Sequence, residues 1–322
     1  MDKKLQLNPN EVVAYLQKDP SLFTWQDMLD FIVAKQIRMI DFMYPAEDGR
    51  VKTLNFTVNS LAYAETVLVE GERVDGSSLF PSFVEAGHSD LYVIPRYRTA
   101  FVDPFSEIPT LCFLCSFFTG DGKFFDCAPY ATLMRASDEF TRSTGLSFEA
   151  MGELEYYVIT DEDALFPATD QRGYHESEPF AKLNDFRRAC MDHVAKTGGQ
   201  MKYGHSEVGN FTMDGKIYEQ NEIEFLPCPL ETAADQLLLA KWVIRNLGYI
   251  HGLDITFAPK IIVGEAGSGM HIHMRMLKDG VNMMTSGGRL SDIALRAIAG
   301  MMELAPAITA FGNKNPTSYF RL

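Results

Sequence analysis

Carboxylate and imidazole side chains alternate with apolar residues in four short segments of the second half of the chain. Each segment is otherwise rich in residues typical of buried strands, and a strand places every second side chain on one face. The acidic and imidazole residues of these segments are Glu153, Glu155, Glu207, Glu222, Glu224, His271 and His273. We expect them to line one face of an antiparallel sheet whose other face is apolar.

Carboxylates gathered on one face repel one another and bind protons unless a multivalent cation lies among them. A site rich in oxygen ligands and poor in imidazole favours Mg²⁺ or Mn²⁺ over zinc. The alternative is a half-exposed sheet whose glutamates face solvent. Four such segments in one half of the chain, with no lysine or arginine in phase, favour the cation site.

A glycine-rich segment, Gly-Glu-Ala-Gly-Ser-Gly-Met-His at residues 264–271, leads into the strand that carries both histidines. Glycine backbone lets a ligand approach closely and offers N–H donors to an anion. The segment matches neither GxxxxGK[ST] nor a GxGxxG between a strand and a helix. A glycine-rich hairpin would look the same, so its position directly before the two histidines makes it a candidate.

The elements that must position these residues belong to an α+β chain of about two domains. We predict a helical segment over residues 1–36, with helices at 9–18 and 25–36. Pro9 is expected in the first turn of the first helix, and Thr24 is expected to cap the second. A small β domain is predicted over 37–129 and an α+β domain over 130–322.

The second domain is expected to contain several helices and strands. The predicted helices are 132–144, 180–196, 232–250 and one that begins at Ser291 and carries Leu295, Ile298 and Met302 on one stripe. The predicted strands are 147–160, 206–208, 220–225, 257–262 and 270–276. The strands do not alternate strictly with helices, which is typical of an antiparallel sheet.

Composition narrows the function classes. The formal net charge of the 322-residue chain is −14, and so acidic a surface disfavours nucleic acid and anionic membrane as partners. The first residues lack the apolar core of a signal peptide, and the longest apolar run, 111–118, is too short to span a bilayer. We therefore expect a cytoplasmic protein. Cys112 and Cys115 form a CxxC inside this run, and we interpret them as core residues, the alternative being a redox or zinc site.

The chain resembles the glutamine synthetase family. The resemblance rests on the segments Gly-Glu-Leu-Glu-Tyr-Tyr from residue 152, Ser-Glu-Val from 206, Glu-Gln-Asn-Glu from 219, Gly-Ser-Gly-Met-His-Ile-His from 267 and Asn-Pro-Thr-Ser-Tyr-Phe-Arg-Leu from 315. In the β domain, Asp-Gly-Ser-Ser from 75 and Ser-Asp-Leu-Tyr-Val-Ile-Pro from 89 resemble the same family. The resemblance implies a β-grasp-like domain followed by a catalytic α+β domain with a curved antiparallel sheet.

The resemblance also implies an ATP-dependent ligase that phosphorylates the side-chain carboxylate of glutamate and lets ammonia displace the phosphate. It assigns Glu155, Glu207 and Glu222 to the metal ion that binds the amino-acid substrate. Glu153 and His271 correspond to ligands of a second Mg²⁺ or Mn²⁺ ion that bridges the ATP phosphates.

The resemblance assigns the remaining site residues as well. Gly267, Ser268 and His273 lie at positions that meet substrate or nucleotide, and Arg321 corresponds to the residue that holds anionic oxygens. Asp75 resembles the aspartate that takes a proton from ammonium in the site of a neighbouring subunit, which implies a homo-oligomeric ring.

The chain departs from the family pattern in three places. Ala266 stands where the family usually has asparagine, Arg275 stands where it usually has serine, and the stretch 209–218 is longer, which indicates a divergent branch. The first two departures keep a γ-glutamyl ligase for another amine, such as a polyamine, as an alternative. His205, two residues before Glu207, could approach the site.

Family members continue well past the segment at 315–322, so we interpret the sequence as C-terminally shortened. The second metal ion would then lack one ligand, and phosphoryl transfer would be slower. A further alternative is therefore a silent homologue or fragment that assembles with full-length subunits or regulates them.

Overall fold

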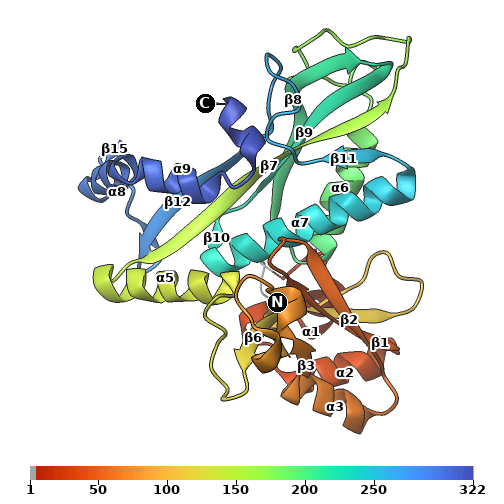
Figure 1. Ribbon diagram of the computed structural model, residues 1–322, viewed down its shortest axis with the longest axis vertical. Helices are drawn as coiled ribbons and strands as arrows, with labels where there is room; N and C mark the ends of the chain where they lie inside the picture. Colours follow the sequence, from red (N-terminus) through yellow and green to blue (C-terminus); the bar gives the residue numbers. More distant parts are fainter. Residues whose placement is uncertain (1–4, 322) are drawn as a thin grey trace. The chain divides into compact units, whose positions relative to one another are not determined.

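The computed structural model describes residues 5–321, which form two compact units (Figure 1). The first unit contains the chain up to Ala136 together with Asp192–Gly199 and Ala234–Trp242. The second contains Ser137–Met191, Gln200–Ala233 and the chain from Val243 onward. The predicted α+β class is confirmed.

One mixed sheet forms the centre of the first unit. Its strands are β1 (Met39–Pro45), β2 (Val51–Thr57), β3 (Glu72–Asp75), β4 (Asp90–Pro95), β5 (Phe101–Val102) and β6 (Thr110–Thr119). They are ordered β2-β1-β6-β4-β3, with β5 on β6, and the pair β1–β6 is parallel. The helices are α1 (Glu11–Leu16), α2 (Trp25–Lys35), α3 (Leu61–Glu70) and α4 (Gly76–Leu79), with 3₁₀ turns at Pro20–Leu22, Ala86–His88 and Tyr97–Thr99.

Local capping explains where the first helices begin. Thr24 caps α2 as predicted, in a capping box in which the side chains of Thr24 and Asp27 each accept from the other's backbone N–H. The cap of α1 is Asn10, whose side chain accepts from the N–H groups of Val12 and Val13. Pro9 therefore lies outside the helix, contrary to the prediction.

The two cysteines of the CxxC lie on opposite faces of β6. Cys115 packs into the core that contains Phe42 and Phe113, and Cys112 packs into a second cluster with Met43 and Leu114. Burial raises the pKa of both thiols well above the usual value. A strand directs residues three apart to opposite faces, so the pair cannot chelate or form a disulfide, and the interpretation as core residues is confirmed.

The second unit is organised around one antiparallel sheet. Its strands are β7 (Ser147–Asp161), β8 (Met201–Met213), β9 (Lys216–Phe225), β10 (Cys228–Pro229), β11 (Asp254–Thr256), β12 (Met270–Lys278) and β13 (Val281–Asn282). They are ordered β13-β12-β7-β9-β8, and β10 and β11 also pair with β7. Figure 1 shows β7 as the long strand that crosses the middle of this sheet.

The remaining elements come before, between or after the strands of this sheet in the sequence. The helices are α5 (Pro129–Thr144), α6 (Asn184–Lys196), α7 (Leu230–His251), α8 (Asp292–Glu303) and α9 (Ala305–Gly312), followed by a 3₁₀ turn at Pro316–Arg321. A two-stranded ribbon joins β14 (Thr285–Ser286) to β15 (Arg289–Leu290). Ser291 caps α8 through the N–H of Ala294, which agrees with the predicted start of the last helix.

Three predicted elements differ from the structure. The strand expected at 257–262 is wrong, because regular pairing ends with β11 and Pro259 has no N–H to donate. The strand expected at 206–208 is part of the longer β8, which joins β9 through a turn at Asp214 and Gly215, both with positive φ (54° and 72°). The helix expected from residue 180 begins only at Asn184.

Polar side chains on the outer face of β9 explain the late start of α6. The Glu219 carboxylate is 2% exposed and accepts from the N–H groups of Lys182 (2.8 Å) and Leu183 (3.2 Å). Asn221 accepts from Arg187 Nη1 of α6 at 2.5 Å. The backbone before Asn184 is thus engaged with β9 and is not available to extend the helix.

Among the described residues, no single helix is long and apolar enough to cross a membrane. In the same part of the chain, only α8 and α9 taken together are long and apolar enough, and the chain bends by 66° between them.

We expect Glu219→Ala to lower the urea midpoint of the second unit. The free energy of unfolding should fall by about 2 kcal/mol, because two buried N–H groups lose a charged acceptor. Glu219→Gln retains one acceptor oxygen and should lose less. Urea denaturation followed by far-UV circular dichroism measures the difference in midpoint. Equal midpoints for wild type, Ala and Gln would contradict this role.

Candidate active site

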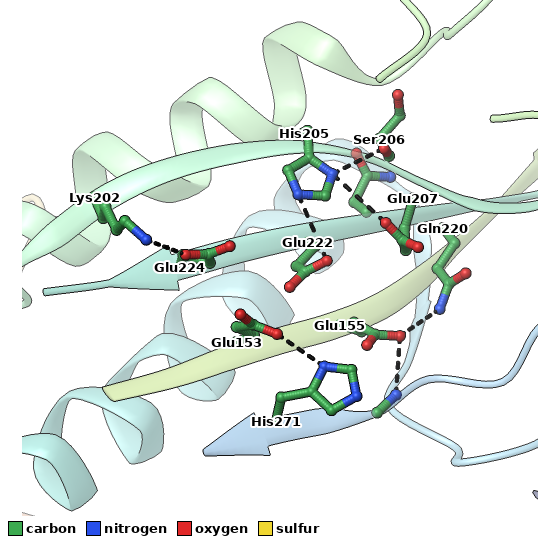
Figure 2. Close-up of polar contacts among 12 residues, drawn as sticks. Glu153, Glu155, Lys202, His205, Ser206, Glu207, Gln220, Glu222, Glu224 and His271 are labelled. Atoms are coloured by element: carbon green, nitrogen blue, oxygen red, sulfur yellow. Dashed lines mark hydrogen bonds and ion pairs between the residues drawn. The ribbon is translucent and has the colours of Figure 1, made fainter. Parts of the chain in front are cut away.

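Strand register brings the predicted carboxylates together on one face of the second sheet (Figure 2). In the β7–β9 ladder, Glu155 is opposite Glu222 and Glu153 is opposite Glu224. In the β12–β7 ladder, His271 is opposite Glu153. The alternation predicted for these strands is therefore what the structure has. The apolar residues between the carboxylates of β7 and β9, Leu154 and Ile223, are buried, whereas Ile272 between the two histidines of β12 is 51% exposed.

Glu207 reaches the same cluster through an irregularity in β8. Ser206 pairs with Asn221 and Asn210 pairs with Glu219, so three residues of β8 lie against the single residue Gln220 of β9. Gln220 Oε1 accepts from the N–H of Gly209 at 2.9 Å. A Cβ atom on Gly209 would lie 1.8 Å from the Tyr157 hydroxyl oxygen, so only glycine fits at this position.

The carboxylates strongly affect one another's charge. Burial is the largest cause, and together with the charges of the neighbouring Glu155, Glu153, Glu207 and Glu224 it raises the pKa of Glu222 to about 8. Burial also raises the pKa of Glu155, against the lowering effect of the Gly269 N–H that it accepts. Without a cation the cluster therefore retains protons near neutral pH, as the sequence predicts for closely packed carboxylates.

Two groups in this cluster have acceptor atoms that make no hydrogen bond. Glu207 Oε2 is buried and has no hydrogen-bond partner among the described residues, and His205 Nδ1 lies 3.6 Å from it. His205 Nδ1 lies 3.0 Å from the Ser206 carbonyl oxygen, which can only accept, so Nδ1 carries the proton. The other ring nitrogen, Nε2, lies 3.6 Å from Glu222 Oε2. A divalent cation with oxygen and imidazole ligands fits this donor set.

His205 and Glu224 are the members of the cluster that the sequence did not assign to a metal ion. Ligand atoms of His205, Glu222 and Glu224 all lie within 4.8 Å of one another. Glu224 also accepts from Lys202 Nζ at 2.8 Å, so the expectation of no basic partner in phase is wrong for this residue. Spacing alone signalled both residues, since His205 is two before Glu207 and Glu224 is two after Glu222.

The residues predicted for the second metal ion lie beside the first cluster. Glu153 accepts from His271 Nδ1 at 2.8 Å and from His273 Nε2 at 2.6 Å. Burial alone would raise the pKa of Glu153, and the two imidazole hydrogen bonds lower it. Both imidazoles are more than half exposed. A ligand that arrives from solvent could therefore replace their hydrogen bonds to Glu153.

The glycine-rich segment forms the edge of the cluster. Glu155 Oε2 accepts from the Gly269 N–H at 2.9 Å and from Gln220 Nε2 at 2.8 Å. A Cβ atom on Gly269 would lie 2.9 Å from Glu155 Oε1 and 3.2 Å from two Arg321 nitrogens, which explains the glycine. Arg321 Nη1 donates to the Ser268 carbonyl oxygen at 2.6 Å. The Ser268 hydroxyl is buried and has no hydrogen-bond partner among the described residues.

Ala266 and Arg275, the two residues at which the chain departs from the family pattern, form hydrogen bonds with neighbouring residues. The Ala266 N–H donates to Gln171 Oε1 at 2.8 Å, and its carbonyl accepts from the Tyr157 hydroxyl at 2.7 Å. Arg275 Nε donates to Glu149 Oε2 at 2.6 Å across the β12–β7 ladder.

Asp75 belongs to the first unit and has its own local environment. It is exposed and accepts from the hydroxyls of Ser77 (2.7 Å) and Ser78 (2.5 Å). These hydrogen bonds, with Ser78 the larger contribution, lower its pKa to about 2.

Comparison with known proteins matches two successive regions of the chain. Residues 36–120 match the glutamine synthetase β-grasp domain, and residues 126–322 match the glutamine synthetase catalytic domain. The predicted β-grasp domain followed by a catalytic domain is thus confirmed.

Relatives and solved structures agree with this match. The chain is 29% identical to the glutamine synthetase of Methylococcus capsulatus, with 93% of this chain and 69% of that protein aligned. It is 30% identical to a 3-hydroxylaminophenol mutase of Cupriavidus pinatubonensis, with 92% and 68% aligned. The structure of Plasmodium falciparum glutamine synthetase superposes with a TM-score of 0.81 at 19% identity and covers 94% of this chain and 64% of that one. The chain therefore spans about two thirds of the length of these proteins.

We expect the affinity for Mn²⁺ to increase from about pH 6 to about pH 8, by up to about tenfold per pH unit, because the metal ion must displace the proton held by Glu222. Above its raised pKa this carboxyl is ionised and the dependence should level off. Electron paramagnetic resonance of free Mn²⁺ measures the affinity, and Glu222→Gln should flatten the profile. An affinity that is constant over this range in the wild type would contradict the prediction.

Proposed function

Because the chain belongs to the glutamine synthetase family, we propose that it is an ATP-dependent ligase that joins ammonia to the side-chain carboxylate of glutamate. In this reaction a glutamate carboxylate oxygen attacks the γ-phosphorus and ADP leaves. The amine nitrogen then forms the C–N bond, phosphate leaves, and a proton is released. The convergence of Glu155, Glu207 and Glu222 around unsatisfied acceptor atoms is the observation that carries the proposal.

We assign two Mg²⁺ or Mn²⁺ ions to the cluster. Glu155, Glu207 and Glu222 would hold the first ion, and Glu153 with His271 would hold the second. When bound, these cations supply the positive charge that phosphoryl transfer needs and that a chain of net charge −14 lacks. The raised pKa of Glu222 supports this assignment, because a cation is the partner that lets the carboxylates ionise together.

Groups of the chain itself would orient the anionic substrates. The Arg321 guanidinium is held by the Ser268 carbonyl through one nitrogen, which leaves its other N–H groups to donate to carboxylate or phosphoryl oxygens. The free hydroxyl of Ser268 and the backbone of Gly267 lie in the same loop and would contact the amino-acid substrate or nucleotide. His273 would approach the nucleotide phosphates from β12.

Asp75 would act on the amine substrate of a neighbouring subunit, and this role requires a homo-oligomeric ring. With a pKa of about 2 it is ionised at neutral pH. It is therefore suited to attract ammonium by charge and to pass on a proton rather than to retain one.

A ligase for a larger amine is the second candidate. Ala266 offers only a methyl group where the family usually has an amide, and its backbone N–H and carbonyl are already engaged with Gln171 and Tyr157. A relative 30% identical to this chain is named for a different reaction, which supports variation of substrate on this fold.

With glutamate, ammonia, ATP and Mg²⁺, we expect the protein to form glutamine and release ADP and phosphate. Glu207→Ala should abolish one Mn²⁺ site in calorimetry and reduce product formation by at least about 100-fold, because a ligand of the reacting centre is lost. Glu162→Gln, at an exposed carboxylate outside the cluster, is the matched control. Unchanged Mn²⁺ binding in Glu207→Ala would remove the metal assignment. Metal binding without product from any amine would instead favour a silent homologue.

We expect Ala266→Asn to shift the ratio of kcat/KM for ammonia to that for ethylamine or putrescine toward ammonia by about tenfold, because an amide narrows and polarises the substrate pocket. Parallel product assays with the three amines measure this ratio. An unchanged ratio would show that residue 266 does not select the amine.

A further inference from the structure

A pocket of about 380 Å³ borders the glycine-rich loop at Glu265, within the second unit. Its walls come from the segment after β7, from the end of β8 and from the segment before β12. The apolar wall is formed by Phe211, Met213 and Ile262. Asp170 and Glu265 supply carboxylates, and Asn210 and Thr212 complete the lining.

Glu265 is incompletely satisfied in this pocket. Its Oε2 atom is buried and has no hydrogen-bond partner among residues 5–321. Lys260 is close, yet its ammonium donates to the backbone carbonyl of Glu265 and not to the carboxylate. A buried carboxylate oxygen without a donor is costly, and Glu265 lines the pocket, so a cationic group bound there would stabilise this carboxylate.

The lining selects the chemical class of that ligand. Two carboxylates repel anions, and an apolar wall gives a hydrated metal ion no ligands. In the described part of the chain, neither Asp170 nor Glu265 belongs to a group of three residues close enough to chelate a metal ion. An ammonium group on an alkyl stem matches both features, because the head can donate to a carboxylate while the stem packs on Phe211 and Ile262.

We propose that this pocket binds a primary alkylamine as its ammonium ion, with Glu265 as the main acceptor. This site is separate from the carboxylate cluster and does not depend on the ligase reaction.

Occupancy of the pocket would act on the glycine-rich loop. Glu265 is adjacent to Ala266, whose carbonyl accepts from the Tyr157 hydroxyl. The Tyr157 ring packs edge-on against Phe211 at 5.8 Å between centroids. A wall of the pocket and the loop that carries Gly267 and Ser268 are thus joined through one buried side chain, so an amine here can be either the co-substrate or an effector.

Calorimetry with n-butylamine and 1,4-diaminobutane, at saturating Mg²⁺ and without ATP or glutamate, tests the site. Mg²⁺ occupies the carboxylate cluster, so the amines report on the pocket. We expect one site whose affinity falls about tenfold or more in Glu265→Gln, because a charged acceptor is lost. Butan-1-ol, the neutral probe, should bind at least about tenfold more weakly for the same reason.

Two further variants separate loss of the site from loss of the fold. Thr212→Trp introduces a large side chain at an exposed position of β8 and should block amine binding without altering Mn²⁺ affinity. Glu162→Gln, on an exposed carboxylate that does not line the pocket, should leave amine affinity unchanged. Absence of amine binding at millimolar concentration, or binding that neither Glu265→Gln nor Thr212→Trp weakens, overturns the proposal and shows a pocket filled by water only.

Addition of ATP and glutamate then distinguishes the two roles that the bound amine could have. Consumption of the amine to a γ-glutamyl amide, with a raised KM in Glu265→Gln, identifies a co-substrate. Binding without consumption, with altered glutamate affinity, identifies an effector. If no ligase activity is found, the binding measurements made without ATP still decide on the pocket.

Discussion

Mutual repulsion among buried carboxylates is the constraint on which the second unit depends. Glu155, Glu207 and Glu222 come from three strands of one sheet, and burial raises the pKa of two of them. Such a cluster is unfavourable unless protons or cations compensate it. The opposite face of the same strands is buried. Asn221 anchors it to α6 and Glu219 anchors it to the backbone just before α6, so the backbone that carries the cluster is held in place. The stability of that face allows the sheet to carry an unfavourable site.

Close approach of backbone to carboxylate is the second requirement. Gly269 must lie against both Glu155 and Arg321, and Gly209 must lie against Tyr157, so a side chain larger than hydrogen is excluded at each. The loop of residues 264–269 contacts the cluster through Gly269 and lines the pocket of Phe211 through Glu265.

Family membership and substrate are separable properties of this fold. Proteins about 30% identical to the chain carry the names of a glutamine synthetase and of a 3-hydroxylaminophenol mutase. The positions at which this chain departs from the family pattern, Ala266 and Arg275, lie on the loop and on the strand that border the cluster. Their neighbours Gln171 and Glu149 hold them by hydrogen bonds, so each departure is accommodated locally without displacement of the carboxylates of the cluster.

The sequence by itself determined which side chains share a face, because alternation along β7, β9 and β12 is a local property of extended backbone. It therefore placed Glu153, Glu155, Glu207, Glu222, Glu224, His271 and His273 on the polar faces of predicted strands, and the resemblance to a family supplied the assignment of five of them to metal ions. Only the tertiary structure decided which strands are neighbours and in what register, and so which residues meet across them. The irregularity of β8 at Glu207, the joining of His205 and Glu224 to the cluster, the salt bridge from Lys202 and the loss of the strand expected at 257–262 all depend on partners distant in sequence. The unsatisfied carboxylate of Glu265 is of the same kind, because burial and the absence of a donor are properties of packing and not of residue type.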